Sequence, residues 1–174
     1  MKFTRRSWMS LAVAGAGSAL LAACGGSDDD DPGNIVEVAS GDARFSILVE
    51  AVAAAGLVST LSGRGPFTVF APTNDAFAAL LAELGISKQA LLADTALLTQ
   101  VLTYHVLAIR VTAADVVALT KPAAITTVQG STFEVGADLG LTDGRGRRAS
   151  LLITDIAASN GVIHAIDRVI LPPA

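Results

Sequence analysis

Apolar and polar residues follow two different patterns along this chain, and the change comes near residue 124. Before it, apolar residues mostly recur three and four positions apart, as in amphipathic helices. After it, short apolar runs rich in Val, Ile and Leu are separated by Gly, Asn and Asp, as in strands joined by turns. Helices first and strands second favour the α+β class, with a layer of helices along one side of a mainly antiparallel sheet.

One strand is expected within the helical half. Residues 67–70 (Phe-Thr-Val-Phe) follow the turn 63–66 and form a short apolar run with high strand propensity. Pro72 is expected to end this strand, because proline has no N–H group to donate to a neighbouring strand.

A helix should follow directly. Thr73 or Asn74 is expected to cap it, and Asp75 lies where the helix dipole favours a carboxylate. Gly85 provides the stop. The apolar face of this helix consists of Phe77, Leu80, Leu81 and Leu84.

The same reasoning places the remaining elements. Helical segments are predicted at residues 35–39, 42–56, 57–61, 87–94 and 96–107, and after a capping box at 112–115. Strands are predicted at residues 125–129, 132–135, 139–142, 150–156 and 162–171, the last two joined by a loop that ends in Asn160-Gly161. The helix at 96–107 carries Tyr104 and His105.

The first residues have the composition of an export signal. Residues 1–23 combine a basic start with an apolar, Ala-rich stretch that is short for a transmembrane helix. Residues 4–9 (Thr-Arg-Arg-Ser-Trp-Met) resemble a twin-arginine signal, and Leu-Ala-Ala-Cys at 21–24 resembles a bacterial lipobox. We therefore expect Cys24 to be lipidated. Gly25 resembles the pattern of retention in an outer membrane rather than an inner one.

Residues 24–34 contain four consecutive aspartates and predict an acidic, flexible tether before a single domain at residues 35–172. Removal of the signal leaves 9 Lys and Arg against 16 Asp and Glu, a net charge of −7, which argues against a nucleic-acid partner. Cys24 is the single cysteine of the sequence, so the domain has no disulfide and depends on its apolar core.

Three segments together resemble the signature boxes of fasciclin domains. They are FTVFAPTNDAF at 67–77, LTQVLTYHVL at 98–107 and NGVIHAIDRVILP at 160–172. The resemblance covers residues 35–171 and is closest to bacterial single-domain lipoproteins. It implies a wedge-shaped β-sandwich with helices along one side, and a role in adhesion rather than catalysis.

Four residues in these boxes are candidates for either binding or structure. In animal members of the family, the boxes containing Asn74, Asp75, Tyr104 and His105 are linked to cell adhesion and receptor binding. The same residue types also suit helix capping and closure of a core. Both interpretations stay open at this point.

Metal and cofactor sites are not expected. The two histidines, His105 and His164, lack the HxH or HExxH spacing of metal ligands and lie on apolar faces, so we expect buried, hydrogen-bonded rings. A binding or pH-sensing role is the alternative for them.

Catalytic signatures are equally absent from the sequence, which contains no G-x-S-x-G motif. Asp155 and Asp167 fall in neighbouring strands and could form an acid–base pair, but surface or ion-paired roles explain them as well.

Arg145, Arg147 and Arg148 form a basic cluster on an acidic domain. They are either a solvated hairpin tip or a contact for an anionic glycan or acidic partner.

These observations predict a non-enzymatic adhesion module, anchored to a bacterial envelope, that contacts proteins or polysaccharides on a cell surface or matrix. The outer membrane or cell surface is the expected location, with the periplasmic face as an alternative. The alternative functions are a periplasmic small-molecule binder and a structural lipoprotein of the envelope.

Overall fold

The structure is a computed structural model that describes residues 32–118 and 122–173. The helices within these residues are α1 (Ile35–Ser40), the 3-10 helix η1 (Ala43–Phe45), α2 (Ser46–Ala54), α3 (Val58–Leu61), α4 (Asn74–Leu84), α5 (Lys88–Ala93), α6 (Thr95–Tyr104) and α7 (Ala113–Val117). The strands are β1 (Phe67–Pro72), β2 (Val106–Leu107), β3 (Ala123–Thr126), β4 (Thr132–Val135), β5 (Gly140–Thr142), β6 (Arg148–Ala158) and β7 (Gly161–Ile166).

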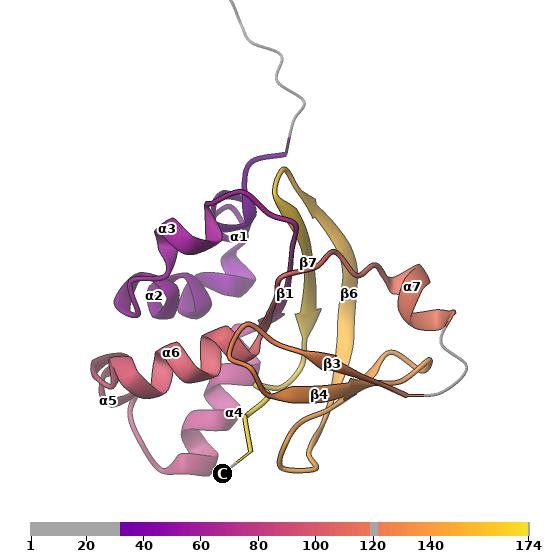
Figure 1. The fold of residues 1–174 in the computed structure, drawn as a ribbon. Coiled ribbons are helices and arrows are strands. Elements are labelled where there is room, and N and C mark those ends of the chain that lie inside the picture. Colours follow the sequence, from indigo (N-terminus) through magenta and orange to yellow (C-terminus); the bar gives the residue numbers. More distant parts are fainter. Residues whose placement is uncertain (1–31, 119–121, 174) are drawn as a thin grey trace, which may run out of the picture.

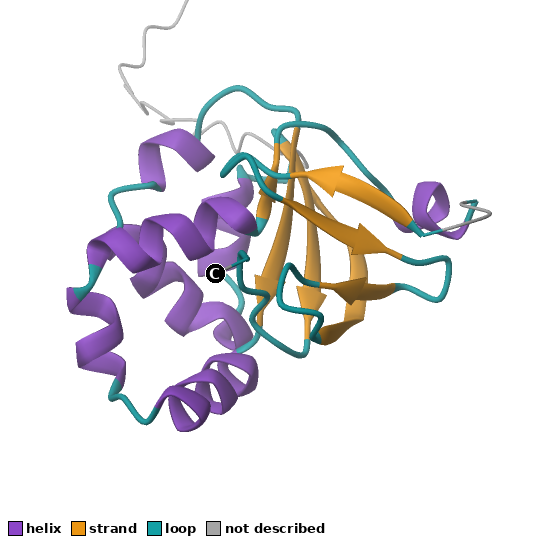
Figure 2. Cartoon of the chain, turned by 60° about the horizontal axis from the view of Figure 1, so that its bottom comes forward, coloured by secondary structure: helices purple, strands orange, loops and turns teal. Residues whose placement is uncertain are grey.

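The described strands form one sheet in the order β2-β1-β7-β6-β5-β4-β3. β1 and β7 run parallel, and the other neighbouring pairs are antiparallel. The two edges of the sheet approach each other, because the N–H of Val128, just after β3, donates to the carbonyl oxygen of Val106 in β2 at 2.8 Å. The sheet is therefore curled almost into a barrel, and helices α1 to α6 cover one side of it (Figures 1 and 2). The predicted α+β class is confirmed.

Alternate residues of β1 face two separate cores, as the two-residue repeat of a strand dictates. Val69 and Ala71 pack with the helices in one apolar cluster. Phe70 points into the curled sheet, where it meets Phe133 edge to face with ring centroids 5.2 Å apart.

The joint between β1 and α4 forms as predicted, with one difference. The strand extends to Pro72, which lies opposite Ile166, rather than to Phe70 as predicted. Proline has no N–H at this position, but the pairing of β1 with β7 continues, because the N–H of Thr73 donates to the carbonyl oxygen of Ile166. Thr73, not Asn74, caps α4, and Gly85 ends it in the left-handed conformation (φ 65°).

Two predicted elements are too long. Helix α6 ends at Tyr104 rather than at 107, because the carbonyl oxygen of His105 accepts the N–H of Phe70 and the chain continues as β2. Strand β7 ends at Ile166 rather than at 171, because the N–H groups of Ile170 and Leu171 donate to side chains instead of a strand. The strand predicted at 125–129 lies at 123–126, since Thr127 already closes a turn with Ser131.

The chain is ordered slightly before the predicted start of the domain. Asn34, assigned to the tether, is the N-cap of α1 and forms a capping box with Glu37. The predicted export signal, Cys24 and the four aspartates lie outside the described residues. Within the described part of the chain, no helix has the length and apolar character needed to cross a membrane.

Candidate functional site

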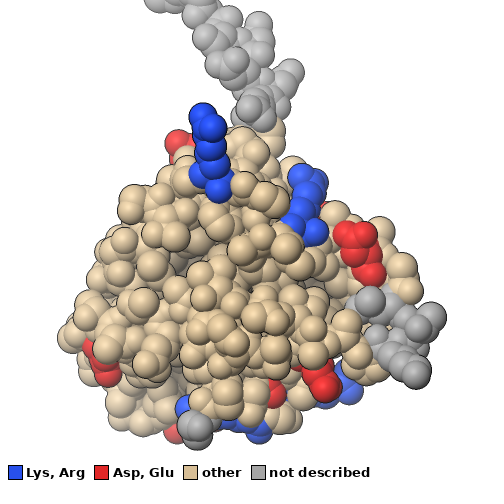
Figure 3. All heavy atoms as spheres, viewed as in Figure 1, with Lys and Arg blue, Asp and Glu red and all other residues tan. Residues whose placement is uncertain are grey.

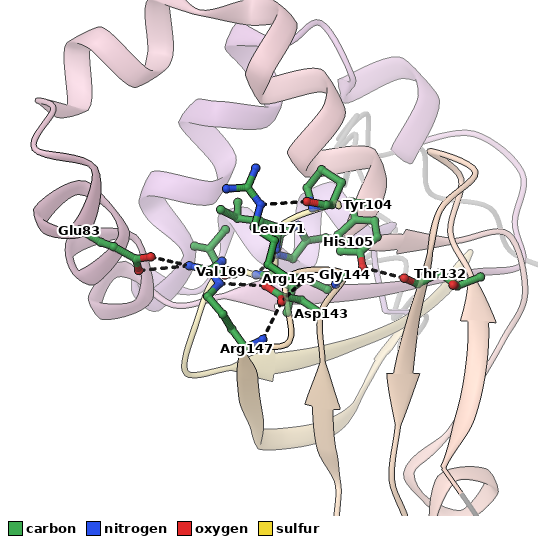
Figure 4. A network of polar contacts seen from close by, with 12 residues as sticks. Glu83, Tyr104, His105, Thr132, Asp143, Gly144, Arg145, Arg147, Val169 and Leu171 are labelled. Atoms are coloured by element: carbon green, nitrogen blue, oxygen red, sulfur yellow. Dashed lines mark hydrogen bonds and ion pairs between the residues drawn. The ribbon is translucent and has the colours of Figure 1, made fainter. Parts of the chain in front are cut away.

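Asp143, one of the Asp residues between the predicted strands of the second half of the chain, is the centre of a polar network (Figure 4). Its buried carboxylate accepts the backbone N–H groups of Arg145 (2.9 Å), Arg147 (2.9 Å) and Leu171 (3.0 Å). Burial raises the pKa of this carboxyl, but the hydrogen bonds from Leu171 and Arg147 outweigh it, so the pKa lies below its ordinary value. The network ties the β5–β6 hairpin to the C-terminal segment.

Arg147 extends this network to the helical layer. Its Nε donates to Asp143 at 3.0 Å, its Nη1 donates to Glu83 of α4 at 2.9 Å, and its Nη2 donates to the carbonyl oxygen of Val169 at 3.1 Å. Only 17% of the side chain is exposed. The guanidinium therefore acts as a structural clamp and has little surface to offer an anionic partner.

The other two arginines of the predicted basic cluster point to different partners. Arg148 pairs with Asp138 at an exposed position, whereas the Nε of Arg145 donates to the carbonyl oxygen of Pro172 at 3.1 Å. The sequence cluster is thus dispersed in space, and a contact with an anionic partner remains a prediction for Arg145 and Arg148.

Tyr104 and His105 lie side by side in the chain and are both buried. The hydroxyl of Tyr104 donates to the carbonyl oxygen of Thr132 (2.8 Å) and accepts the N–H of Gly144 (2.9 Å), and burial raises its pKa. Gly144 can lie here because it has no Cβ, which would be 2.7 Å from the backbone nitrogen of Pro173.

His105 is held in one neutral tautomer. Its Nδ1–H donates to the carbonyl oxygen of Val101 at 2.7 Å, while its Nε2 accepts the N–H of Ile170 at 3.1 Å. Burial lowers its pKa to about 4, although the bond to Val101 and the charge of Asp143 act in the opposite direction. Tyr104 and His105 are therefore closed off from a partner's surface.

In His164 the roles of the two ring nitrogens are exchanged relative to His105. Its Nδ1 accepts the N–H of Asp155 at 3.2 Å, and its Nε2–H donates to the carbonyl oxygen of Val111 at 2.8 Å. Both ring nitrogens of each histidine are therefore hydrogen-bonded to backbone groups. No cluster of three or more His, Cys, Asp or Glu suited to a metal occurs among residues 32–118 and 122–173.

Asp155 and Asp167, considered above as an acid–base pair, each bond a separate backbone segment. The carboxylate of Asp155 accepts the N–H of Ala113, and that of Asp167 accepts the N–H of Ser150. Both carboxylates therefore stabilise the backbone.

Asn74 connects α4 to η1 and to the start of α2. Its Oδ1 accepts the N–H of Ile47 (3.1 Å), and its Nδ2 donates to the carbonyl oxygen of Ala43 (2.9 Å). Its neighbour Asp75 is exposed. Both residues border a surface cleft of about 400 Å³, here called the Asp75 cleft, lined by Ala43, Arg44, Thr73, Asn74, Asp75, Leu152, Ile153 and Ala165.

Asn74→Ala is expected to lower the free energy of unfolding by about 1–3 kcal/mol, because it leaves the Ile47 and Ala43 backbone groups without their partner. Asp75→Ala is the matched control and should cost less than about 1 kcal/mol, since only its favourable position at the helix start is lost. Urea unfolding followed by circular dichroism measures both. Equal losses for the two variants would contradict the structural role of Asn74.

Comparisons with known proteins agree with this geometry. The model of the fasciclin domain family matches residues 43–172. Protein sll1483 of Synechocystis sp. is 48% identical over 149 residues, which are 83% of this chain and 76% of that protein. Transforming growth factor-beta-induced protein ig-h3 of Sus scrofa is 39% identical over 142 residues, covering 82% of this chain but 20% of ig-h3.

A solved structure supports the same fold. The paired FAS1 domains of the insect cell adhesion molecule fasciclin I superpose with a TM-score of 0.64 at 14% sequence identity, over 81% of this chain and 51% of that one. The family match, the sequence relatives and the curled sheet under a helical layer all lead to one assignment. The chain belongs to the fasciclin domain family.

Proposed function

We propose that this protein is a non-enzymatic adhesion module that is held at a bacterial envelope and contacts a protein or polysaccharide on another cell or on a matrix. Its relationship to a cell adhesion molecule supports this function, as does the commitment of its histidines and of Asp155 and Asp167 to backbone groups. The module binds through its outer surface, since Tyr104 and His105 are internal.

The observation that carries this proposal is the Asp75 cleft. Its lining includes two large apolar side chains of β6 that face solvent, with Leu152 exposed by 55% and Ile153 by 37%. The same lining includes the polar side chains of Asp75, Asn74 and Arg44. Protein interfaces combine apolar and polar side chains in this way, which favours a protein over a polysaccharide as the partner here.

The cleft lies away from the proposed membrane anchor. The carbonyl oxygen of Gly33, where the tether ends, accepts the N–H of Ser159, close to the start of β1. The cleft is at the other end of β1, roughly 20 Å away for a six-residue strand. The cleft is therefore at the end of β1 opposite the point where the tether joins the domain, and a lipid anchor at Cys24 would leave it unobstructed.

Replacing Leu152 and Ile153 together with serine is expected to reduce adhesion at least about tenfold, because the apolar centre of an interface supplies most of its affinity. Beads coated with the purified protein and counted on cells of the producing species provide the measurement. Val117→Ser is the matched control, since Val117 is 57% exposed but outside the cleft.

Unchanged adhesion of the double variant would rule out this cleft as the contact surface. A Cys24→Ala form expressed in the same cells tests the anchor separately. It should move from the membrane fraction to the soluble fraction, and a form that stays with the membrane would remove the lipid anchor from the proposal.

A further inference from the structure

A second cleft lies where α4, α5 and α6 meet the C-terminal segment after β7. It has a volume of about 250 Å³, and we call it the Arg145 cleft. Its lining combines leucines from three helices with two prolines: Phe77, Leu80, Leu84, Leu91, Leu97, Leu98, Gln100, Val101, Leu102, Arg145, Leu171, Pro172 and Pro173. None of these residues borders the Asp75 cleft.

The walls of this cleft are apolar apart from two side chains, those of Gln100 and Arg145. Leu84, on its wall, is 42% exposed although it belongs to the apolar face of α4. Leaving apolar surface in contact with water is unfavourable, so an apolar ligand here gains free energy by covering it. A mostly apolar cleft with a few fixed polar groups is the usual form of a small-molecule site.

Arg145 supplies the fixed polar group. Its Nε is bonded to the carbonyl oxygen of Pro172, which orients the guanidinium, and Figure 4 shows its terminal nitrogens pointing away from the Asp143 network. Among the described residues, the neighbouring carboxylates of Asp143 and Glu83 form their ion pairs with Arg147 instead. The positive charge of Arg145 is therefore available to a ligand in the cleft.

We propose that the Arg145 cleft binds a single-chain alkyl carboxylate, with its chain among the leucines and its carboxylate on the guanidinium of Arg145. A guanidinium matches a carboxylate with two parallel hydrogen bonds. The cleft, with its volume of about 250 Å³, suits much of a medium-length alkyl chain better than a folded partner.

This function is independent of adhesion through the Asp75 cleft. It names a ligand class for the small-molecule binder that the sequence offered as an alternative function. The described chain begins with residues 32–34 at one end of the molecule, whereas the C-terminal segment that lines the Arg145 cleft ends at the other (Figure 1). The Arg145 cleft therefore lies away from the point where the tether would join the domain.

The test uses dodecanoate below its micelle concentration, titrated into the purified protein at neutral pH in a calorimeter. We expect saturable binding with one site per chain. Arg145→Gln should weaken it about tenfold or more, the loss expected for a charge-assisted hydrogen bond. Leu84→Glu should also weaken it, because it places a negative charge on the wall at a position exposed enough to tolerate a polar side chain.

Arg148→Gln is the matched control, since its exposed pair with Asp138 is not part of the cleft. Dodecyltrimethylammonium carries the same chain with the opposite charge and should bind much more weakly than dodecanoate. The proposal is overturned if dodecanoate does not bind, if the cation binds equally well, or if Arg145→Gln and Leu84→Glu retain full affinity. Binding of an apolar peptide without binding of dodecanoate would also overturn it, in favour of a protein partner.

Discussion

Replacing Asp143 with alanine is expected to lower the free energy of unfolding by about 3–5 kcal/mol, the typical cost of removing one partner from a buried ion pair. The variant leaves the guanidinium of Arg147 without its internal carboxylate. It also leaves the N–H groups of Arg145 and Leu171 without an acceptor. Urea unfolding monitored by circular dichroism and by Tyr104 fluorescence measures the loss.

Asp138→Ala is the matched control for this experiment. Asp138 also pairs with an arginine of the β5–β6 hairpin, Arg148, but both side chains are more than 60% exposed. Such pairs contribute little to stability, so the midpoint of unfolding should not change measurably. Similar losses for the two variants would show that the ion pairs of the hairpin are equivalent and that burial of Asp143 has no special weight.

The network around Asp143 also explains which parts of the fold the sequence could predict. The joint from β1 to α4 and the capping box before α7 follow from neighbouring residues, and both form as expected. Asp143 and Asn160 looked like ordinary turn residues. In the structure, Asn160 binds the backbone of Ile35, Leu61 and Gly63, which are about a hundred residues away in sequence. Such contacts leave no periodic signal.

The two elements predicted too long fail for a related physical reason. Apolar residues follow the end of α6 directly at 106–107, and they resume after β7 at 169–171, beyond the charged pair Asp167-Arg168. The apolar pattern alone therefore does not mark where either element ends. The stop comes from hydrogen bonds made across the fold, including the one from the N–H of Ile170 to the Nε2 of His105. This one hydrogen bond joins the residue that follows α6 to the segment that follows β7, so it bears on the end of both elements.

The candidate sites show the same division. Asn74 and Asp75 were recognised from local sequence, but Leu152 and Ile153, which complete the Asp75 cleft, are on a distant strand. The basic cluster at 145–148 was recognised as well, yet its three side chains diverge. Clefts arise where elements that are remote in sequence meet, and a single sequence does not indicate which remote elements lie close together in space.

His105 should make the protein sensitive to mild acid. Its pKa is lowered to about 4 in the folded protein, whereas an unfolded histidine titrates near 6.5. Between these values the unfolded chain binds a proton that the folded chain does not, so stability is greatest above pH 6.5 and falls as the pH drops towards 4. The loss over this window should amount to roughly 3 kcal/mol.

His105→Gln separates this effect from other titrations. The variant should be less stable at pH 7.5, because it cannot reproduce both the bond to Val101 and the bond from Ile170. It should also lose most of the decline between pH 6.5 and 4.5, because glutamine does not titrate. Asp143 faces His105 and adds its own acid sensitivity, but at lower pH, since its pKa lies below the ordinary value of 3.8. Urea unfolding at half-unit pH steps measures both slopes. Equal slopes in the two proteins would mean that the pKa of His105 is the same in the folded and the unfolded chain, and would contradict the lowered pKa.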